Sequence, residues 1–490
     1  MDFTEIYKQS SGIVAFSPGA HFVLTAVQDR VVIRRADTFQ ITRTWLSSSD
    51  AQSSQVSSRS QGSAKSQPVQ PDAWITHASW SNDSEYLLAA CAKRGVVNIF
   101  KLRDESWNAR VNVGTESLVK AEWAPDGRSI LCFSSWGLRV TIWSLITGTC
   151  TYIQYPLHPD RGYGFRPDGR YLIIAERHKS KDTLGVYDAS ELYRLVRHFP
   201  LPTSTLASLS ISPNGDYVAI WEGPMEFRVY ILNLSGNTVG SFTPDLDPGY
   251  GIRSVVWHPS GFFLLVAGWD DKIHILERLT WGPVALLELQ SRIGNPVIVW
   301  REPSDWLEKT QGRGFLSYER LQPPHSIAVG RPDFSKGNPK SGVVQLSFNV
   351  SGTLLLARFE SAPTAVFLYA FPSASDHDVP TRPEASVSLA PKLKSVLIHT
   401  NPVVAARWNP VRKGSLAISC GTGSIYLWSD EWVGDDATGE SEEVAECVGI
   451  PARQFNAQDI RWAPDGKGLI LLDKEAFCCA FEVEDEEQPV

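Results

Sequence analysis

The stretch Trp123-Ala124-Pro125-Asp126-Gly127 recurs along this chain in altered copies. Each copy begins with an aromatic or aliphatic anchor, passes through a turn that usually contains proline, and leads into an apolar strand. Clear copies start at Phe16, Phe165, Ile211, Trp257 and Trp462, and weaker copies start at Trp80, Phe348 and Trp408. The anchors from Trp80 to Trp257 are 43, 42, 46 and 46 residues apart. This period matches the roughly 40–45 residues of a four-stranded propeller blade, so an all-β propeller with about nine blades is predicted.

The residues around Trp123 show the expected pattern of one blade. Residues 118–123 form an inner strand, and the Pro-Asp-Gly turn reverses the chain into a second strand at 129–133. A third strand follows at 140–144, and 151–155 supplies the outer strand. Apolar runs separated by Pro, Asn, Asp and Gly are typical of strands joined by tight turns.

The two ends of the chain are predicted to complete one blade together. The last unit stops after its third strand at 477–483, and residues 4–8 look like an outer strand that precedes the first inner strand. Such closure would cover an otherwise open sheet edge. We prefer one large ring. The alternative is two joined propellers with a junction near 282–345, an interval that reads as an irregular or degenerate blade.

Three segments interrupt the repeats. Residues 47–72 are rich in Ser and Gln and cannot bury enough apolar area to offset their chain entropy, so disorder is expected. Residues 372–391 and 434–446, the latter acidic, fit loop insertions in outer-strand connections. All three read as tolerated loops, with phosphorylation of the serine tract as a secondary alternative.

The composition favours a soluble repeat protein with a rigid aromatic core. The chain has 490 residues, with 17 Trp and 21 Phe beside two Met. It contains no apolar run near the roughly 18 residues of a membrane span and no signal-peptide pattern, so a cytoplasmic protein is expected. A net charge of -8 without a basic run argues against nucleic-acid binding.

The residues give no indication of catalysis. The seven cysteines are odd in number and lack C-x-x-C spacing, which argues against a zinc site and a disulfide framework. The ten histidines form no metal-binding motif, and neither a nucleophile elbow nor a phosphate-binding loop occurs. We therefore predict no enzyme, no catalytic or metal-binding residue and no cofactor.

A propeller without catalytic groups usually presents its turns to other proteins. The turns between the second and third strands of successive units carry aromatic and arginine side chains, the types that dominate protein interfaces. The candidate partner-binding residues are Trp136, Arg177, Trp221, Trp269, Arg94 and Phe359. The competing interpretation is that each tryptophan simply packs on a neighbouring blade.

Two strand endings resemble the tryptophan–aspartate ending that names the WD-repeat family. They are Ile142-Trp143-Ser144 and Leu427-Trp428-Ser429-Asp430. The Gly-His pair that usually begins such repeats is absent from most units. This departure puts the buried His–Asp hydrogen bonds of the family in question, but not the blades.

Several further stretches resemble one family, the WD-repeat protein eight family of centrosomes and fungal spindle pole bodies. They include 1–8, 93–97, 168–172, 251–257, 271–276 and 338–340. The likeness covers nearly the whole chain. The sequence departs from the family pattern at the Ser/Gln-rich insertion and at the acidic insertion. It implies a noncatalytic adaptor that anchors microtubule minus ends at the centrosome or spindle pole body and supports spindle assembly. The implied partners are a coiled-coil adaptor protein, a minus-end-directed kinesin and gamma-tubulin complex components.

Two other propeller classes are alternatives. A phosphoinositide-binding propeller carries a Phe/Leu-Arg-Arg-Gly motif in a late blade, whereas the nearest match here, Ile33-Arg34-Arg35-Ala36, lies in the first unit and lacks the glycine. A translation-initiation propeller would suit nine blades but requires ribosome contacts that this acidic sequence does not indicate.

Overall fold

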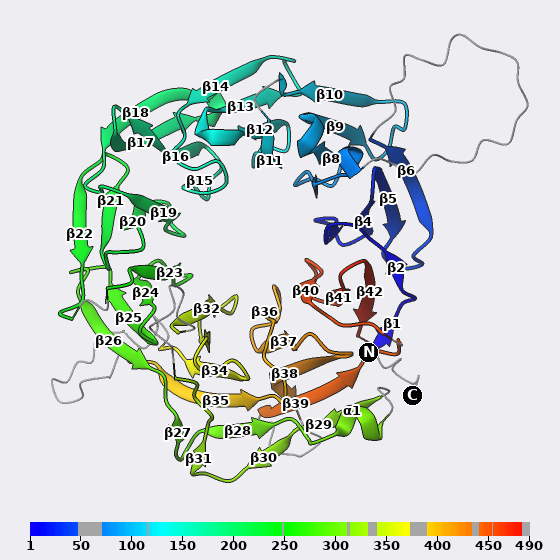
Figure 1. The fold of residues 1–490 in the computed structure, drawn as a ribbon, viewed down its shortest axis with the longest axis vertical. Helices are drawn as coiled ribbons and strands as arrows, with labels where there is room; N and C mark the ends of the chain where they lie inside the picture. Colours follow the sequence, from blue (N-terminus) through cyan, green and yellow to red (C-terminus); the bar gives the residue numbers. More distant parts are fainter. Residues whose placement is uncertain are drawn as a thin grey trace, which may run out of the picture. The chain divides into compact units, whose positions relative to one another are not determined.

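The computed structural model describes residues 1–47, 71–114, 117–246, 249–310, 314–331, 341–372, 390–433, 441–452 and 454–482. They fall into two compact units, residues 1–160 with 463–490 and residues 161–462, and each is described by itself. Among the described residues there is one α-helix, α1 (Trp306–Lys309), and almost all other regular structure is strand (Figure 1). The predicted all-β propeller class is confirmed. The described residues form nine blade sheets, four built mainly from the first unit and five from the second.

Three blades of the first unit are antiparallel sheets whose four strands follow one another in chain order. Their strands are β3 (Val14–Phe16), β4 (Phe22–Val27), β5 (Arg30–Arg35) and β6 (Ile41–Leu46); β7 (His77–Trp80), β8 (Tyr86–Cys91), β9 (Val96–Lys101) and β10 (Asn108–Asn112); and β11 (Leu118–Trp123), β12 (Ser129–Ser134), β13 (Arg139–Ser144) and β14 (Cys150–Gln154).

Strand β8 shows why the second strands are continuous apolar runs. Successive side chains of a strand point to opposite faces. Leu87 and Ala89 pack into the core shared with the preceding blade, and Leu88 and Ala90 pack into the core shared with the following blade. Both faces are buried, so the strand cannot alternate apolar and polar residues.

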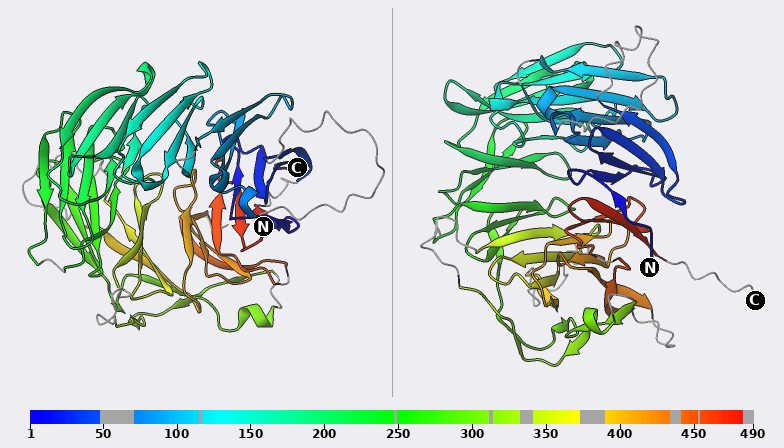
Figure 2. Two further views of the ribbon diagram at one scale, coloured as in Figure 1. Left: turned by 45° about the horizontal axis from the view of Figure 1, so that its top comes forward. Right: turned by 45° about the vertical axis from the view of Figure 1, so that its right-hand side comes forward.

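The last blade of the first unit joins both ends of the chain. Strand β41 (Gly468–Leu472) pairs with β42 (Ala476–Phe481), and the outer edge of β42 is covered by β1 (Asp2–Phe3) and β2 (Tyr7–Lys8). Gln9 extends the contact, because its Nε2 donates to the carbonyl oxygens of Asp473 and Lys474. Figure 2 shows the blue N-terminal strands beside the red C-terminal strand. The predicted closure by the N-terminal strand is confirmed.

The tryptophan anchors of the repeated phrase connect successive blades. Each donates its indole N–H to a carbonyl oxygen on the inner strand of the preceding blade, which satisfies a donor that would otherwise be left in the core. The bonds run from Trp80 to Ala15 (3.3 Å), Trp123 to Ser79 (3.2 Å), Trp257 to Ser210 (3.3 Å), Trp408 to Ser347 (3.0 Å) and Trp462 to Arg407 (2.9 Å). The sequence period therefore corresponds to a physical contact between blades.

The second unit contains five further blades. Their strands are β15 (Tyr163–Phe165), β16 (Tyr171–His178), β17 (Lys181–Asp188) and β18 (Arg194–Pro200); β19 (Leu206–Ile211), β20 (Tyr217–Glu222), β21 (Val229–Asn233) and β22 (Thr238–Phe242); β23 (Ile252–Trp257), β24 (Phe263–Gly268), β25 (Lys272–Glu277) and β26 (Pro283–Glu288); β32 (Val343–Phe348), β33 (Leu354–Phe359), β34 (Ala365–Ala370) and β35 (Lys392–Ile398); and β36 (Ala405–Trp408), β37 (Ser415–Ser419), β38 (Ser424–Val433) and β39 (Ser441–Gly449). Strand β40 (Asp459–Trp462) ends this unit.

The interval 282–345, predicted as irregular or as a degenerate blade, forms no blade of its own among the described residues. Strand β26 completes a regular blade; of the short strands that follow, three add to the outer edges of later blades and two pair only with each other. Of these strands, β27 (Arg292–Ile293) pairs with β31 (His325–Ser326), β28 (Ile298–Arg301) pairs with β35 and β30 (Glu319–Leu321), and β29 (Phe315–Ser317) pairs with β39. The interval holds neither unit boundary, so it is not a junction between the units. The preference for one ring stays a prediction.

A buried carboxylate fastens this added segment to the blades. Glu302 is 6 % exposed and accepts three hydrogen bonds. The donors are Trp306 Nε1 at 2.8 Å, the Tyr426 hydroxyl at 2.7 Å and the Thr400 backbone N–H at 2.7 Å. A buried carboxylate needs such donors to offset its lost hydration, so the segment is held by a specific polar contact as well as by strand pairing.

The acidic insertion is shorter than predicted. Residues 441–446 belong to strand β39, which pairs with β38 as far as Val433 opposite Ser441. In the sequence, acidic residues surround apolar positions such as Val444, so the pattern of a strand is not apparent there. Residues 434–440 lie outside the described residues, as do 48–70 of the Ser/Gln-rich segment and 373–389 of the other predicted loop.

Candidate partner-binding surface

The predicted contact residues do lie at the ends of second strands or in the turns that follow them. Arg94 ends the 3-10 turn η2 (Ala92–Arg94) between β8 and β9, and Trp136 lies in η4 (Ser135–Gly137) between β12 and β13. In the second unit, Arg177, Trp221, Trp269 and Phe359 stand at or next to the ends of β16, β20, β24 and β33. The surroundings of these side chains differ greatly.

Trp136 is the most exposed of them. Its side chain is 91 % accessible and makes no ring contact with another described residue. Its backbone is left-handed, with φ at +62°, a conformation that is unusual for a bulky residue. Ser134 closes this turn, because its buried hydroxyl accepts from the Arg139 N–H at 2.9 Å and donates to the Arg139 carbonyl at 2.8 Å. A hydrogen-bonded turn therefore holds a large apolar ring in solvent.

Other exposed apolar side chains lie in the same turn as Trp136 and on or just after the outer strand β14 of the same blade. Leu138 is 46 % exposed, Tyr152 49 % and Tyr155 56 %. The Tyr155 N–H donates to the Leu138 carbonyl at 3.0 Å, and a Cβ on Gly137 would come within 2.6 Å of the Pro156 carbonyl oxygen. The turn after β12 and the end of β14 are thus in direct contact. We call Trp136, Leu138, Tyr152 and Tyr155 the aromatic patch.

The aromatic patch also has a cation at its edge. The Arg139 guanidinium lies 4.6 Å from the centre of the Tyr152 ring. Exposed aromatic rings next to an arginine are the composition expected of a binding hot spot. Sequence reasoning identified Trp136 but not the other three members. The signal available for Tyr152 and Tyr155 was their position on the predicted outer strand.

Arg94 and Arg177 are exposed but differ in their attachments. Arg94 lies on the surface of the first unit, next to Lys93, which pairs with Asp72 at 3.3 Å. Arg177 contacts the fully buried carboxylate of Asp182 at 2.7 Å. Its guanidinium therefore balances a core charge while remaining partly accessible.

Asp182 also makes hydrogen bonds that take the place of the buried His–Asp hydrogen bonds of the WD-repeat family. Its Oδ2 accepts from the Leu206 N–H at 2.8 Å and from the Thr203 hydroxyl at 3.2 Å. Asp271 occupies the corresponding place two blades later and accepts from the Gly342 N–H at 2.7 Å and the Ser361 hydroxyl at 2.6 Å. In these two blades, backbone and hydroxyl donors of the next blade thus bond to the aspartate in place of the usual histidine.

Trp269 is built into the joint between two blades of the second unit. The Arg253 guanidinium lies 4.5 Å from its ring centre. Arg253 also donates to the Ser341 carbonyl at 2.6 Å and to Glu360 Oε2 at 2.9 Å. The left-handed Gly342 backbone packs on Trp269, where a Cβ would come within 2.5 Å of its Cα. For Trp269 these contacts favour the neighbour-packing interpretation.

The remaining two candidates are less accessible. Trp221 is partly buried and packs against the apolar cluster that includes Phe227 and Val229. Phe359 is 1 % exposed and makes an edge-on contact with Phe367, with ring centres 5.4 Å apart. The prediction that Phe359 contacts a partner is wrong, because both faces of β33 are buried.

The cysteines are placed as structural residues. Burial raises the pKa of the Cys132 and Cys478 thiols to about 12, so both are protonated and weakly nucleophilic at neutral pH. The described residues hold no group of three or more His, Cys, Asp or Glu suited to a metal ion. No helix among the residues that the structure describes is long and apolar enough to cross a membrane.

The nearest match to a phosphoinositide motif has structural contacts. Arg34 is 9 % exposed and lies 4.7 Å from the Tyr7 ring centre. Arg35 pairs with Asp37 at 2.5 Å. Both guanidinium groups therefore already contact other side chains, which argues against their use as phosphate ligands.

Comparisons with known sequences agree with the repeat architecture. The WD domain, G-beta repeat family matches residues 237–276, which span β22 to β25. The chain is 30% identical to the WD repeat-containing protein WRAP73 of Mus musculus over 504 residues, covering 98% of this chain and 96% of that protein. It is 22% identical to an uncharacterized WD repeat-containing protein of Schizosaccharomyces pombe, over 80% of this chain and 77% of that protein. The C-terminal WD40 domain of Sif2 aligns with 92% of this chain and 99% of that chain at 12% identity and a TM-score of 0.47.

Proposed function

The chain belongs to the WD-repeat family that includes mouse WRAP73, and from this premise we propose that it is a noncatalytic scaffold of the centrosome or spindle pole body. The observation that carries the proposal is the match over nearly the full length of both chains. It supports the resemblance to the WD-repeat protein eight family at the level of the whole chain rather than of one repeat.

In this proposal the protein anchors microtubule minus ends and supports spindle assembly. It acts through a coiled-coil adaptor protein and a minus-end-directed kinesin, with gamma-tubulin complex components as further partners. These roles follow from the family resemblance. The propeller contributes rigid blades whose turns hold contact residues in fixed positions, which limits the entropy lost on binding.

We propose the aromatic patch as the main contact with the coiled-coil partner. Trp136 can place an apolar ring in the groove between helical side chains, and Tyr152 and Tyr155 offer hydroxyls at the edge of such a contact. Arg94, on the equivalent turn of the neighbouring blade, could pair with acidic side chains of the same helix. Arg177 and Trp221 are candidates for contacts made by the second unit.

The location is tested with a fluorescent tag on the chromosomal copy of the gene. Dividing cells are imaged together with a marker of the microtubule-organising centre. We expect the tagged protein to concentrate at that centre throughout spindle assembly. A uniform cytoplasmic signal at every stage of division would contradict the proposed function.

The partner surface is tested by affinity capture from the same cells with quantitative mass spectrometry. Trp136→Ala is compared with Ile146→Ala, which removes a 77 % exposed side chain from the turn between β13 and β14 of the same blade. We expect the first variant to lose the coiled-coil partner and the second to retain it. Equal capture by both variants would place the contact on another surface.

A further inference from the structure

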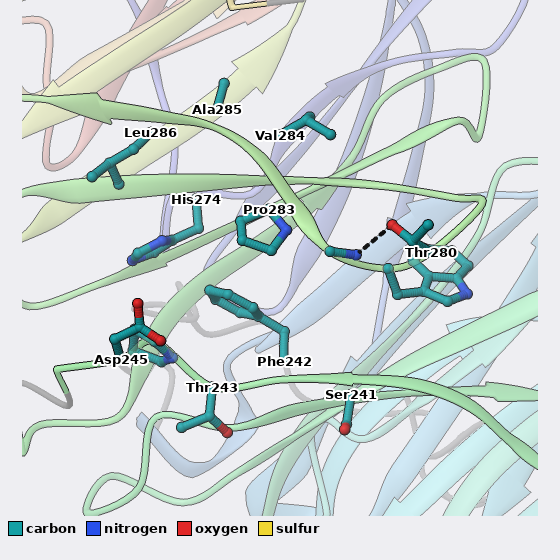
Figure 3. Close-up of a pocket in the computed structure, with 13 residues that line it drawn as sticks. Ser241, Phe242, Thr243, Asp245, His274, Thr280, Pro283, Val284, Ala285 and Leu286 are labelled. Atoms are coloured by element: carbon teal, nitrogen blue, oxygen red, sulfur yellow. Dashed lines mark hydrogen bonds between the residues drawn. The ribbon is translucent and has the colours of Figure 1, made fainter.

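A pocket of about 550 Å³ opens between the outer strands of two neighbouring blades in the second unit. One wall is the end of β22 with the residues after it, and the other is formed by β25, β26 and the turn between them (Figure 3). The volume falls within the range usual for small-ligand sites, roughly 300–1,000 Å³. None of the predicted contact residues lines it.

The floor of the pocket is apolar and buried. Phe242 and Trp281 are 8 % and 4 % exposed, and Pro283 and Leu286 of β26 also line the pocket. Gly240 allows the two blades to approach, because a Cβ there would lie 2.4 Å from the Trp281 ring.

His274 supplies a buried polar atom without a partner. The residue is 9 % exposed, and its Nε2 is buried without a hydrogen bond to any described residue. Its ring is held by Phe227 and Phe242, with centres 5.6 and 5.1 Å away. Figure 3 shows the ring pointing to the side of the pocket where Asp245 lies. Burial lowers the pKa of His274, so the neutral imidazole has one nitrogen able to accept a hydrogen bond.

The charge at the pocket is negative. Among the lining residues the only full charge is the carboxylate of Asp245, which is exposed and makes no ion pair or hydrogen bond within the described residues. Two cations lie near, but each has an acidic partner. The cation–carboxylate pairs are Arg228 with Glu226 at 3.1 Å and Lys272 with Glu288 at 3.2 Å. An anionic ligand such as a phosphate headgroup would meet an unbalanced carboxylate here.

We propose that this pocket binds a basic side chain, preferably arginine, from a partner polypeptide. The aliphatic stem of such a side chain covers the apolar floor while its cationic head remains at the polar rim. A guanidinium presents several donors in a fixed plane, so it can pair with the carboxylate of Asp245 and, once the side chains that cover it shift, also donate to the buried Nε2 of His274. Lysine offers the charge but not the planar array. This recognition site is independent of the proposed spindle-pole role.

The probe is a blocked, fluorescein-labelled hexapeptide of alanine and leucine that carries one arginine. Its binding to the full-length protein is followed by fluorescence anisotropy. Matched peptides replace the arginine by citrulline, which keeps the shape but lacks the charge, or by lysine or glutamate. We expect arginine to bind about tenfold more tightly than citrulline, because a hydrogen bond between charged groups is lost. Lysine should bind with intermediate affinity and glutamate should not bind.

Variants assign the binding to this pocket. Asp245→Asn should weaken arginine binding about tenfold, and His274→Phe should weaken it severalfold while keeping the ring contacts with Phe227 and Phe242. Leu246→Ser changes an 87 % exposed neighbour that does not line the pocket, and Asp160→Asn removes an equal charge elsewhere. Neither control should change the affinity. Unchanged thermal melting of all four variants excludes unfolding as the cause.

Three results would overturn the inference. The first is no saturable binding of the arginine peptide at any accessible concentration. The second is equal affinity for arginine and citrulline, which would show that the charge is not recognised. The third is wild-type affinity in Asp245→Asn, which would place the binding elsewhere on an acidic protein whose net charge is -8.

Discussion

Trp136 and Trp269 occupy equivalent turns, yet one projects into solvent and the other is part of a joint between blades. Trp136 is 91 % exposed on a left-handed backbone. Trp269 is covered by the Arg253 guanidinium at 4.5 Å, and Gly342 packs against its backbone. The position of a tryptophan within a blade therefore does not determine its role. What differs is whether nearby segments of the same protein supply a cation and a glycine that pack against the tryptophan.

The largest expected difference between these two turns is in partner affinity. Truncation of a hot-spot tryptophan costs about 2 kcal/mol or more, which is roughly thirtyfold in Kd. We therefore expect Trp136→Ala to lower affinity for the isolated coiled-coil partner about thirtyfold, measured by titration calorimetry. Trp269→Ala should change it less than threefold. The opposite order would assign the two tryptophans the reverse roles.

The next largest effect is on stability, and it concerns the Trp269 turn. Arg253→Ala removes a bond to the Ser341 carbonyl, an ion pair with Glu360 and the contact with the indole. Together these losses should lower the free energy of unfolding by about 1.5 kcal/mol. Urea unfolding followed by tryptophan fluorescence measures the change.

Arg301→Ala is the matched control for Arg253→Ala. Arg301 pairs with Glu319, but both side chains are 47% exposed. Exposed ion pairs contribute roughly 0–1 kcal/mol, so this variant should remain close to wild type. A comparable loss in both variants would show that the joint at Trp269 has no special strength.

A smaller effect is expected for the coupling between Arg253 and Trp269. If the guanidinium–indole contact stabilises the joint, the two single substitutions and the double substitution should not be additive. The coupling free energy should be about 0.5–1 kcal/mol in a double-mutant cycle. Additive losses would mean that Arg253 acts only through Glu360 and the Ser341 carbonyl.

The smallest predicted effect has the opposite sign and concerns the Trp136 backbone. Glycine adopts a positive φ without the steric cost that a side chain incurs. Trp136→Gly should therefore raise stability by about 0.5 kcal/mol over Trp136→Ala, which keeps a Cβ on the same left-handed backbone. Thermal melting of the two variants gives the comparison, and a less stable glycine variant would argue against strain at this turn.

The blades could be predicted because the signals that define them are local and repeated. Trp80 and Trp123 mark inner strands in the sequence, and in the structure each indole bonds to the preceding inner strand. The spacing between anchors is thus the length of chain needed to build one blade and return to the centre. The same regularity exposed the missing outer strand of the last unit.

The added strands of the second unit could not be predicted in the same way. Strand β28 pairs with β35 and β29 pairs with β39, both far along the chain. Edge pairing of this kind depends on which backbone groups are left free after the blades form, and no repeated residue pattern records it. Glu302 reads as an ordinary surface residue until Trp306 and Tyr426 are seen to donate to it.

The candidate surface was predicted only in part. Trp136 could be identified because an isolated aromatic residue between two strands has no obvious core role. Phe359 has a similar sequence position but ends a strand buried on both faces. Leu138 and Tyr155 were missed because their proximity depends on backbone contacts between the turn and the outer strand. Sequence locates a turn more readily than it shows which way the side chains of the turn face.

The pairing of β1 and β2 with β42 sets an order for biosynthesis. The first unit is built from residues on both sides of the second unit, so all of the second unit is translated between its two parts. The second unit can fold while the N-terminal strands still lack their partner. Strands β1 and β2 gain their partner only once β42 has emerged, so the growing chain carries them unpaired while all the residues between them and β42 are translated.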